Sequence, residues 1–205
     1  MWSELSAQWQ CVFEQAVLAF REGNIPIGAA LFDENGELIA ADRNRINKDS
    51  RTKAMKGLNS RISPAEMNVL RQLDTSKYEL RDLILYTTME PCPMCMGTAL
   101  MSNIRHIRYA AHDPYCGMAH LARSEPYYMS KQLDIRHEGG EAEQFQLTIQ
   151  CITELRSAKS DAVYRQFREY APKAADRARK LYDDSDFIML EGQLSAAEMY
   201  DFIMI

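Results

Sequence analysis

The sequence predicts an α/β sandwich, because segments with helical periodicity alternate along the chain with short, β-rich apolar runs. The chain has 205 residues, of which 46% are hydrophobic and 26% are charged. At roughly 100–200 residues per domain, this length predicts one domain, or one domain with an appendage. The composition is that of a globular protein and excludes wholesale disorder.

The first quarter of the chain predicts a helix followed by a β-hairpin. Apolar residues recur at offsets of three and four over residues 3–20, which is typical of an amphipathic helix. An apolar run over residues 25–32 predicts a strand, Asn35-Gly36 predicts a tight turn, and residues 37–42 predict the returning strand. The polar, basic stretch over residues 43–62 then predicts a long functional loop.

The middle of the chain predicts further alternation of helices and strands. A helix is expected from Ser63 to about Asp74, and an apolar helix is expected to run from the Cys92 region to about Met101. Three more strands are expected, over residues 83–88, 104–111 and 133–137, with a short helix over 117–124. Such sheets place their sites at strand ends and helix starts.

The last third of the chain predicts helices alone. Helical spacing begins near Gly140, and a charged helix begins near Asp161. Pro172 should break or kink that helix, so two short helices fit as well as one long one. The tail over residues 183–205 fits either a docking segment or a frayed end. We therefore expect one domain over residues 1–140, and a helical extension over 141–205 that packs on it.

Charge favours a small molecule over nucleic acid as the partner. The 24 Lys and Arg against 29 Asp and Glu give a net charge of −5, which provides no general attraction to polyphosphate. The predicted loop over residues 43–62 contains five basic residues, which could bind a phosphate or a nucleotide or could simply face solvent. They are Lys48, Arg51, Lys53, Lys56 and Arg61. No run predicts a membrane span and no signal peptide is expected, so the expected location is cytoplasmic, with no membrane partner.

Cys92 and Cys95 are the two cysteines with a chemically informative spacing. The five cysteines of the chain do not form a regular disulfide pattern. Two thiols three residues apart at a helix start lie on one face and could hold one divalent ion, with zinc the natural candidate. A redox pair and two ordinary buried thiols remain open alternatives. Ser63 to Glu66 reads as a capping box with Pro64 at the first helical position.

Several segments in order over residues 8–125 resemble the cytidine deaminase superfamily, in its branch of nucleobase, nucleoside and tRNA adenosine deaminases. The family signature is H-x-E followed downstream by P-C-x-x-C. In this chain Glu66 and Cys92 are 26 residues apart. The segments that carry the resemblance are Ile25–Ala30, Arg43–Arg45, Pro64–Asn68, Thr88–Cys95 and Asp113.

The resemblance implies a three-layer α/β/α sandwich around a five-stranded mixed sheet, here with a helical C-terminal extension. It implies a hydrolase that removes an amine from a cytosine-, guanine- or adenine-type base or nucleoside with the help of zinc, and a homo-oligomer. It further implies a role for each matching residue: Glu66 as the catalytic acid and base, Cys92 and Cys95 as zinc ligands, and Asn44, Ala65 and Asp113 in substrate binding.

Pro64 departs from the family pattern, because it occupies the position of the third zinc ligand, a histidine, and offers no donor atom. We therefore expect weakened zinc binding and impaired catalysis, unless His112 or Cys116 replaces the missing ligand. One alternative is a deaminase-fold protein that binds a ligand without turnover. Another is a substituted form of a normal enzyme, which Pro64→His would restore. A tRNA adenosine deaminase is a further alternative that the acidic balance does not favour.

Overall fold

The structure is a computed structural model that describes residues 1–46, 60–157 and 161–205. Its centre is a sheet of five strands in the order β2-β1-β3-β4-β5. β1 pairs antiparallel with β2 and with β3, whereas β3, β4 and β5 run parallel, so the sheet is mixed. The strands are β1 (Gly28–Phe32), β2 (Leu38–Arg43), β3 (Ile84–Met89), β4 (His106–Ala111) and β5 (Asp134–His137).

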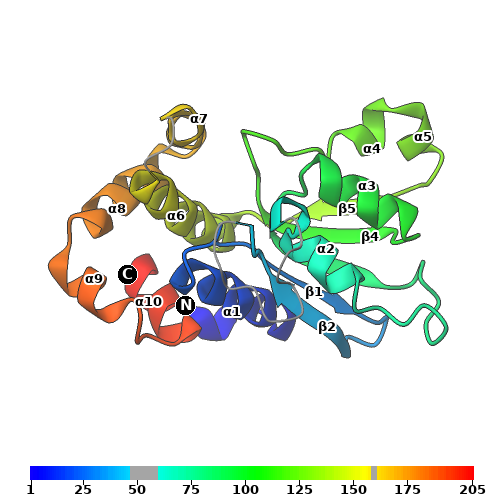
Figure 1. Ribbon diagram of the computed structural model, residues 1–205, viewed down its shortest axis with the longest axis horizontal. Coiled ribbons are helices and arrows are strands. Elements are labelled where there is room, and N and C mark those ends of the chain that lie inside the picture. The colour runs from blue at the N-terminus through cyan, green and yellow to red at the C-terminus, as the bar shows by residue number, and fades with distance from the viewer. Residues whose placement is uncertain (47–59, 158–160) are drawn as a thin grey trace.

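Helices cover both faces of the sheet and make the three layers that the sequence predicted (Figure 1). α1 (Ala7–Arg21) and α6 (Gly140–Arg156) pack on one face, and their apolar residues form one core with the sheet. α2 (Ala65–Leu70) and α3 (Pro93–Met101) pack on the other face around a second core that includes Val69, Met96 and Ile107. The predicted fold class is therefore confirmed.

The first quarter of the chain folds much as predicted, with one difference at the N-terminus. The single expected helix is divided into a 3-10 turn, η1 (Trp2–Glu4), and α1, whose start is capped by the Ser6 side chain. Asp33 accepts hydrogen bonds from the backbone of Asn35 and Glu37 and shapes the hairpin turn. In the predicted basic loop, Lys48, Arg51, Lys53 and Lys56 lie outside the described residues, and Arg61 lies in η3 (Ser60–Ile62).

α2 is shorter than predicted, because it ends at Leu70 rather than near Asp74. Past Leu70 the backbone bonds tighten to three-residue spacing, with Gln72 N–H donating to Val69 O and Leu73 N–H donating to Leu70 O. The predicted helix over 117–124 is also reduced, to α4 (Leu121–Ser124). A further short helix, α5 (Pro126–Met129), precedes β5 and was not predicted.

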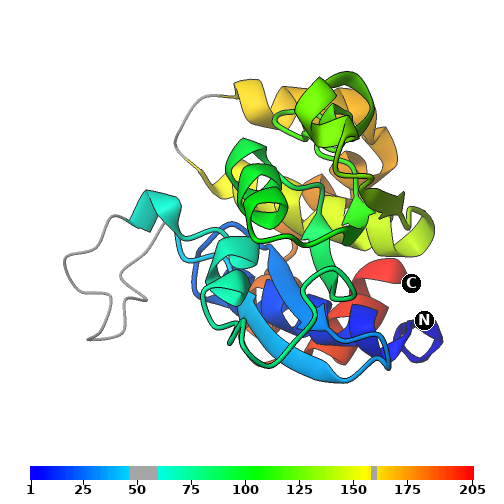
Figure 2. The ribbon, with the colours of Figure 1, turned by 90° about the vertical axis from the view of Figure 1, so that its right-hand side faces the viewer.

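The C-terminal third is helical, as expected, and it packs on the rest of the chain. α7 (Ala162–Tyr170) ends two residues before α8 (Pro172–Tyr182) begins, so Pro172 separates two helices. The tail is ordered as α9 (Ser185–Leu190) and α10 (Ala196–Met204). Both views place the two termini side by side (Figures 1 and 2), where Trp2 N–H donates to Asp201 Oδ1 at 2.7 Å. The tail therefore docks on its own chain.

The division into residues 1–140 and an extension over 141–205 remains our proposal for the domain organisation. The residues that α6 to α10 bury belong to the same core as α1, so we infer that the extension is an integral part of one domain. In the part of the chain that the structure describes, no helix is both long and apolar enough to cross a bilayer.

Candidate active site

The loops after two parallel strands meet the starts of two helices at one edge of the sheet. β3 leads into Glu90 and Cys92, and β4 leads into His112 and Asp113. Because β3 and β4 are parallel, these loops leave the sheet at the same edge. A cavity of about 460 Å³ opens there, bordered by the starts of α2 and α3 and by residues of α6 and α7. Small-molecule sites have volumes of about 300–1,000 Å³.

Glu66, in the first turn of α2, contributes a buried carboxylate to the wall of this cavity; the residue is 3% exposed. Thr87 Oγ1 donates a hydrogen bond to Oε1 at 3.1 Å, and Cys95 Sγ donates to Oε2 at 3.2 Å. Burial raises the pKa of the Glu66 carboxyl, and the two hydrogen bonds offset only part of that rise. A raised pKa brings the group closer to the working range of a general acid or base.

The predicted capping box at the start of α2 is wrong. Pro64, not Ser63, is the N-cap residue, and no side chain caps the helix. Glu66 does not turn back toward the helix start, because its carboxylate is held by Thr87 and Cys95. The acidic residue of the apparent box therefore belongs to the cavity.

Cys92 and Cys95 lie at the start of α3, as the spacing predicted. Cys92 is the N-cap residue, Pro93 is the first helical residue, and the two sulfur atoms are 3.1 Å apart with both thiols free. The close contact with Cys95 lowers the pKa of the Cys92 thiol. The same contact, together with burial, raises the pKa of Cys95 well above its ordinary value. The pair therefore loses a first proton readily and a second one with difficulty.

Pro64 borders the cavity together with Glu66 and the two cysteines. Its ring provides no donor, and the described residues include no group of three or more His, Cys, Asp or Glu side chains that could hold a metal ion. Catalytic zinc sites use three protein ligands and leave the fourth position for water. The residues present, with Cys92 and Cys95 as the two suitable donors, do not fit such a site.

The two candidates for a replacement ligand both have other partners. His112 Nδ1 pairs with Glu90 Oε2. Cys116 borders the cavity, but its Sγ donates to Asp113 Oδ2 at 3.2 Å. Burial raises the pKa of the Cys116 thiol, which disfavours the thiolate that a metal requires. These contacts give no support to a replacement ligand from this loop.

Glu90 ties the cysteine loop to the loop after β4. Its residue is 4% exposed, and its carboxylate accepts hydrogen bonds from Asp113 N–H at 3.2 Å and Ala119 N–H at 2.8 Å. Gly117 packs against this carboxylate so closely that a Cβ atom would lie 2.4 Å from the Glu90 Cδ atom. Glu90 therefore positions the cavity wall, and the motif analysis did not single it out.

The three residues expected to bind substrate have different positions. Asn44 is 1% exposed and borders the cavity; its Oδ1 accepts from Ile46 N–H at 2.9 Å, so its amide nitrogen is the end suited to a ligand. Asp113 also borders the cavity, and its Oδ1 accepts from the backbone of Tyr115 and Cys116. Ala65 differs, because its side chain packs in the second hydrophobic core. A ligand could therefore contact Ala65 only through its backbone atoms.

The C-terminal helices complete the cavity with residues that the motifs did not indicate. Gln150 and Glu154 from α6 contribute polar groups, and Val163 and Phe167 from α7 contribute apolar ones. The only available signal was weak, since Gln150 and Glu154 are four residues apart on a predicted helix and so lie on one face.

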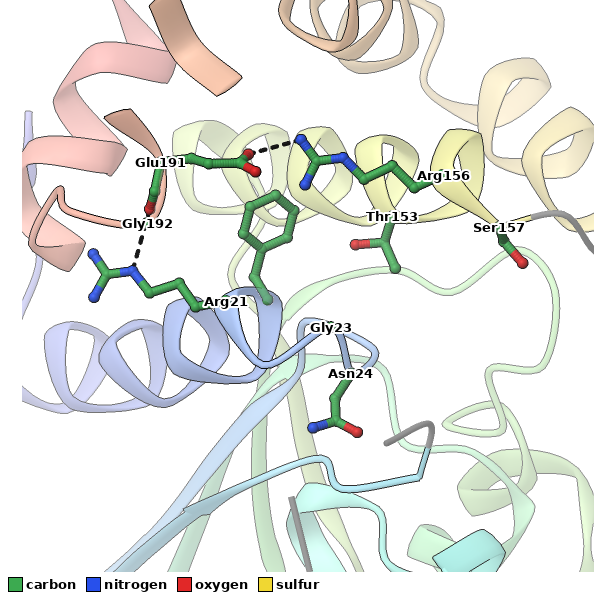
Figure 3. Close-up of a pocket in the computed structure, with 9 residues that line it drawn as sticks. Arg21, Gly23, Asn24, Thr153, Arg156, Ser157, Glu191 and Gly192 are labelled. Atoms are coloured by element: carbon green, nitrogen blue, oxygen red, sulfur yellow. Dashed lines mark hydrogen bonds and ion pairs between the residues drawn. The ribbon is translucent and has the colours of Figure 1, made fainter. Parts of the chain in front are cut away.

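A second cavity of about 460 Å³ lies where α9 meets the ends of α1 and α6 (Figure 3). Glu191 joins these elements, because its carboxylate accepts from Arg156 at 2.7 Å and its backbone oxygen accepts from Arg21 Nε at 3.3 Å. The Arg156 guanidinium also lies over the Phe20 ring, 5.1 Å from its centroid. These contacts attach the extension and do not resemble a reactive site.

Residues 4–111 match the family model described as the cytidine and deoxycytidylate deaminase zinc-binding region. The match includes more than half of the chain, and the chain therefore belongs to this deaminase family. Relatives of this chain include proteins named as deaminases. The family is described as zinc-binding, whereas the described part of this chain has no group of three or more His, Cys, Asp or Glu side chains that could hold a metal ion.

Named relatives include proteins that act on transfer RNA. The chain is 34% identical over 106 residues to the tRNA-specific adenosine deaminase of Bacillus subtilis. The aligned segment covers 51% of this chain and 60% of that protein. It is also 34% identical over 96 residues to a tRNA(Ile)-lysidine synthase of Deinococcus radiodurans. That aligned segment covers 45% of this chain and 15% of the synthase. The chain thus spans less than two thirds of either relative.

One similar solved structure comes from studies of A-to-I editing by tRNA:A34 deaminases at the wobble position of transfer RNA. It has a TM-score of 0.52 and 28% sequence identity, and the similarity covers 69% of this chain and 97% of that one.

Proposed function

We propose that the cavity binds a nucleobase or a nucleoside, and that hydrolytic removal of an amine from the base is the reaction for which its residues are arranged. The observation that carries this proposal is the buried Glu66 carboxylate, 3.2 Å from Cys95 Sγ in the wall of a largely apolar cavity. A planar ring suits the apolar walls, which include Ile25, Ile27, Met89, Val163 and Phe167.

Glu66 is the group suited to carry the proton in this reaction. In hydrolytic deamination, water adds to the ring carbon that bears the amine, and ammonia leaves. A proton must therefore travel from the water to the departing nitrogen. The raised pKa of Glu66 favours proton uptake, and Thr87 fixes one carboxylate oxygen. We assign the orientation of the ring to the Asn44 amide and to the loop held by Asp113.

We further propose that Pro64 strongly impairs this reaction. Zinc is the cofactor expected for the family, and when bound it lowers the pKa of its water to about 7. In this chain Cys92 and Cys95 would be its protein ligands, and the third position offers no donor. We therefore expect weak zinc binding and little turnover in the chain with Pro64.

Ammonia release tests this proposal with cytosine, adenine, guanine and their nucleosides as substrates. We expect Pro64→His to release ammonia from at least one of them, at a rate at least a hundredfold above that of the parent chain. The double variant Pro64→His/Glu66→Gln should lose that activity while keeping the metal. A Pro64→His protein that binds zinc but releases no ammonia from any of these compounds would contradict the assignment to deamination.

Pro64 also favours a second candidate function, a deaminase-fold protein that binds a base or nucleoside without turnover. This candidate predicts that the parent chain binds such a ligand and that Pro64→His adds no activity. The first candidate predicts both binding and restored turnover. Equilibrium binding and ammonia release, measured on the same two proteins, distinguish the candidates.

A third candidate, a tRNA adenosine deaminase, is favoured by the names of the similar proteins. The net charge of −5 argues against polyanion binding as the main source of affinity. We therefore place a free base or nucleoside first. Turnover of a tRNA by Pro64→His, with none of the small compounds turned over, would reverse this order. The predicted homo-oligomer and cytoplasmic location also remain predictions.

A further inference from the structure

Cys92 and Cys95 place two free thiols in contact at the start of α3. Their sulfur atoms are 3.1 Å apart. Pro64 provides no donor beside them, and the part of the chain that the structure describes has no group of three or more His, Cys, Asp or Glu side chains that could hold a metal ion. The residues present therefore favour a reaction of the two sulfurs with each other over shared metal binding.

The two thiols differ in their access to solvent. Cys92 is half-buried and borders the cavity, whereas Cys95 is buried, with 2% of the residue exposed. Cys92 is also the N-cap residue of α3, so it precedes the first turn of the helix. Redox-active cysteines are typically accessible and lie next to a second cysteine that resolves the first adduct. Cys92 and Cys95 match these two roles.

The distance between the two sulfur atoms is close to that of a covalent bond. A disulfide has an S–S length of about 2.05 Å, so the atoms need to approach each other by only about 1 Å. Cys116 borders the same cavity, but its Sγ contacts Asp113 Oδ2 at 3.2 Å. Cys92 and Cys95 are therefore the two thiols placed to react with each other.

We propose that Cys92 and Cys95 are a reversible redox site, which a low-molecular-weight disulfide oxidises to an intramolecular disulfide. Cys92 Sγ attacks one sulfur of the reagent, which forms a mixed disulfide and releases one small thiol. Cys95 Sγ then attacks Cys92 Sγ, which forms the bond between the two cysteines and releases the second small thiol. The two protons of the protein thiols pass to the two small thiols, so the reagent gains the two electrons that the pair loses.

Oxidation changes the surroundings of Glu66. Cys95 Sγ donates to Glu66 Oε2 at 3.2 Å, and a disulfide sulfur has no proton to donate. Thr87 Oγ1 keeps its hydrogen bond to the other carboxylate oxygen. The redox state of the pair is thus connected to the residue proposed as the proton carrier, although the reaction of the thiols requires neither a bound base nor turnover.

Mass spectrometry after treatment with cystamine, a small symmetric disulfide, tests the inference. Free thiols are alkylated with iodoacetamide before digestion. Trypsin cleaves after Lys and Arg, so Cys92 and Cys95 stay together in the peptide over residues 82–105, and Cys116 falls in the peptide over 109–123. We expect the first peptide of the treated parent chain to be lighter by two hydrogen atoms and to carry no alkyl group. Dithiothreitol should restore both alkylation sites.

Single serine substitutions identify the role of each thiol. In Cys95→Ser, which retains a hydrogen-bond donor for Glu66, Cys92 should keep one cysteamine group, because no second thiol resolves the mixed disulfide. In Cys92→Ser, the peptide over 82–105 should stay unmodified, since Cys95 is buried. Cys116→Ser is the matched control from the same cavity and should still form the bond. Circular dichroism confirms that each variant is folded, and the peptide of the parent chain gives a result that needs no variant.

Zinc distinguishes this inference from a metal site. The parent chain and Pro64→His are each incubated with zinc and then treated with cystamine. Zinc should leave the rate of oxidation of the parent peptide unchanged. It should slow oxidation of the Pro64→His peptide by about tenfold or more, because sulfurs that hold a metal are not free to attack a disulfide.

Three results would overturn the inference. If the parent peptide over 82–105 stays fully alkylated, or retains cysteamine without closing the bond, the pair is not a redox site. If Cys116→Ser no longer forms the bond, Cys116 is the partner instead. If zinc protects the parent as well as it protects Pro64→His, the two cysteines hold the metal without a histidine. The proposed deamination stands in the first two cases, and only the third changes the role assigned to Pro64.

Discussion

Burial of the Glu66 carboxyl has a cost in stability that its two hydrogen bonds offset only in part. Thr87 and Cys95 each donate one bond, yet burial still raises the pKa of the group. A side chain that is costly to bury and lies in a cavity is typical of a functional site, where stability is given up for chemistry.

Glu66→Gln should therefore stabilise the protein at neutral pH. The unfolded chain ionises this carboxyl near pH ~4.3, whereas the folded chain holds the proton to higher pH. The contribution of Glu66 to stability therefore falls as pH rises above about 4. We expect the variant to gain of order 1 kcal/mol in free energy of unfolding at pH 7, and no advantage below about pH 4. Urea unfolding across this range measures the difference; a parent chain more stable than the variant at pH 7 would contradict it.

At the residue scale, sequence motifs located one side of the cavity and missed the other. The motifs predicted five residues that border the cavity, because each belongs to a segment that carries the family resemblance: Asn44, Glu66, Cys92, Cys95 and Asp113. Gln150 and Glu154 were not foreseen, because only the packing of α6 in the folded chain brings them to the cavity. The capping box failed for the same reason, because a distant strand supplies the partner of Glu66.

At the scale of elements, the cavity depends on close packing between two loops. Glu90 accepts two backbone hydrogen bonds across the gap between them, and it pairs with His112. Gly117 allows this approach, because a Cβ atom there would meet Glu90 Oε2 at 2.4 Å and Asp113 O at 2.7 Å.

Gly117→Ala should displace the Glu90 carboxylate and destabilise the protein. Overpacking of this kind costs about 1–3 kcal/mol in free energy of unfolding. Gly97→Ala is the matched control, because Gly97 lies within α3 and a Cβ atom there meets nothing within 4 Å. That variant should be neutral or more stable by up to about 1 kcal/mol. Denaturant unfolding compares the two; equal stability would show that the contact at Gly117 relaxes without cost.

The sequence predicted the existence of most elements better than their limits. The strands could be predicted because each short β-rich run is bounded by turn residues, as at Asp33–Gly36 between β1 and β2. α2 ended early, although Leu73 continued the apolar periodicity, because Leu73 packs against the second core from a tightened turn rather than a helix. The periodicity of apolar residues indicates which residues are buried, but it does not determine whether a helix or a tightened turn buries them.

At the scale of the whole molecule, the C-terminal helices and the sandwich share one core. Phe187 of α9 and Tyr200 of α10 are fully buried, and Tyr200 contacts the rings of Trp2 and Phe13. The sequence left open whether the tail docks or frays, because an amphipathic pattern does not identify the surface that covers it. The structure favours a single cooperative unit.

Phe187→Ala should destabilise the entire chain rather than its tail alone. Removal of a fully buried phenylalanine costs about 3–5 kcal/mol. We expect thermal unfolding to remain a single transition at a lower temperature, followed by far-UV circular dichroism and by the fluorescence of Trp2 and Trp9. Ile188→Ala, at an exposed neighbour, should change stability by less than about 0.5 kcal/mol. Separate transitions for the two probes would instead show that the extension unfolds on its own.

We propose that this chain keeps the deaminase pocket but lacks one metal donor at Pro64. Elemental analysis of zinc in the purified parent chain and in Pro64→His tests it most directly. We predict about one zinc per chain in Pro64→His and far less in the parent, because only the variant has three protein ligands. About one zinc per chain in the parent protein would contradict the claim and would show that another residue completes the site.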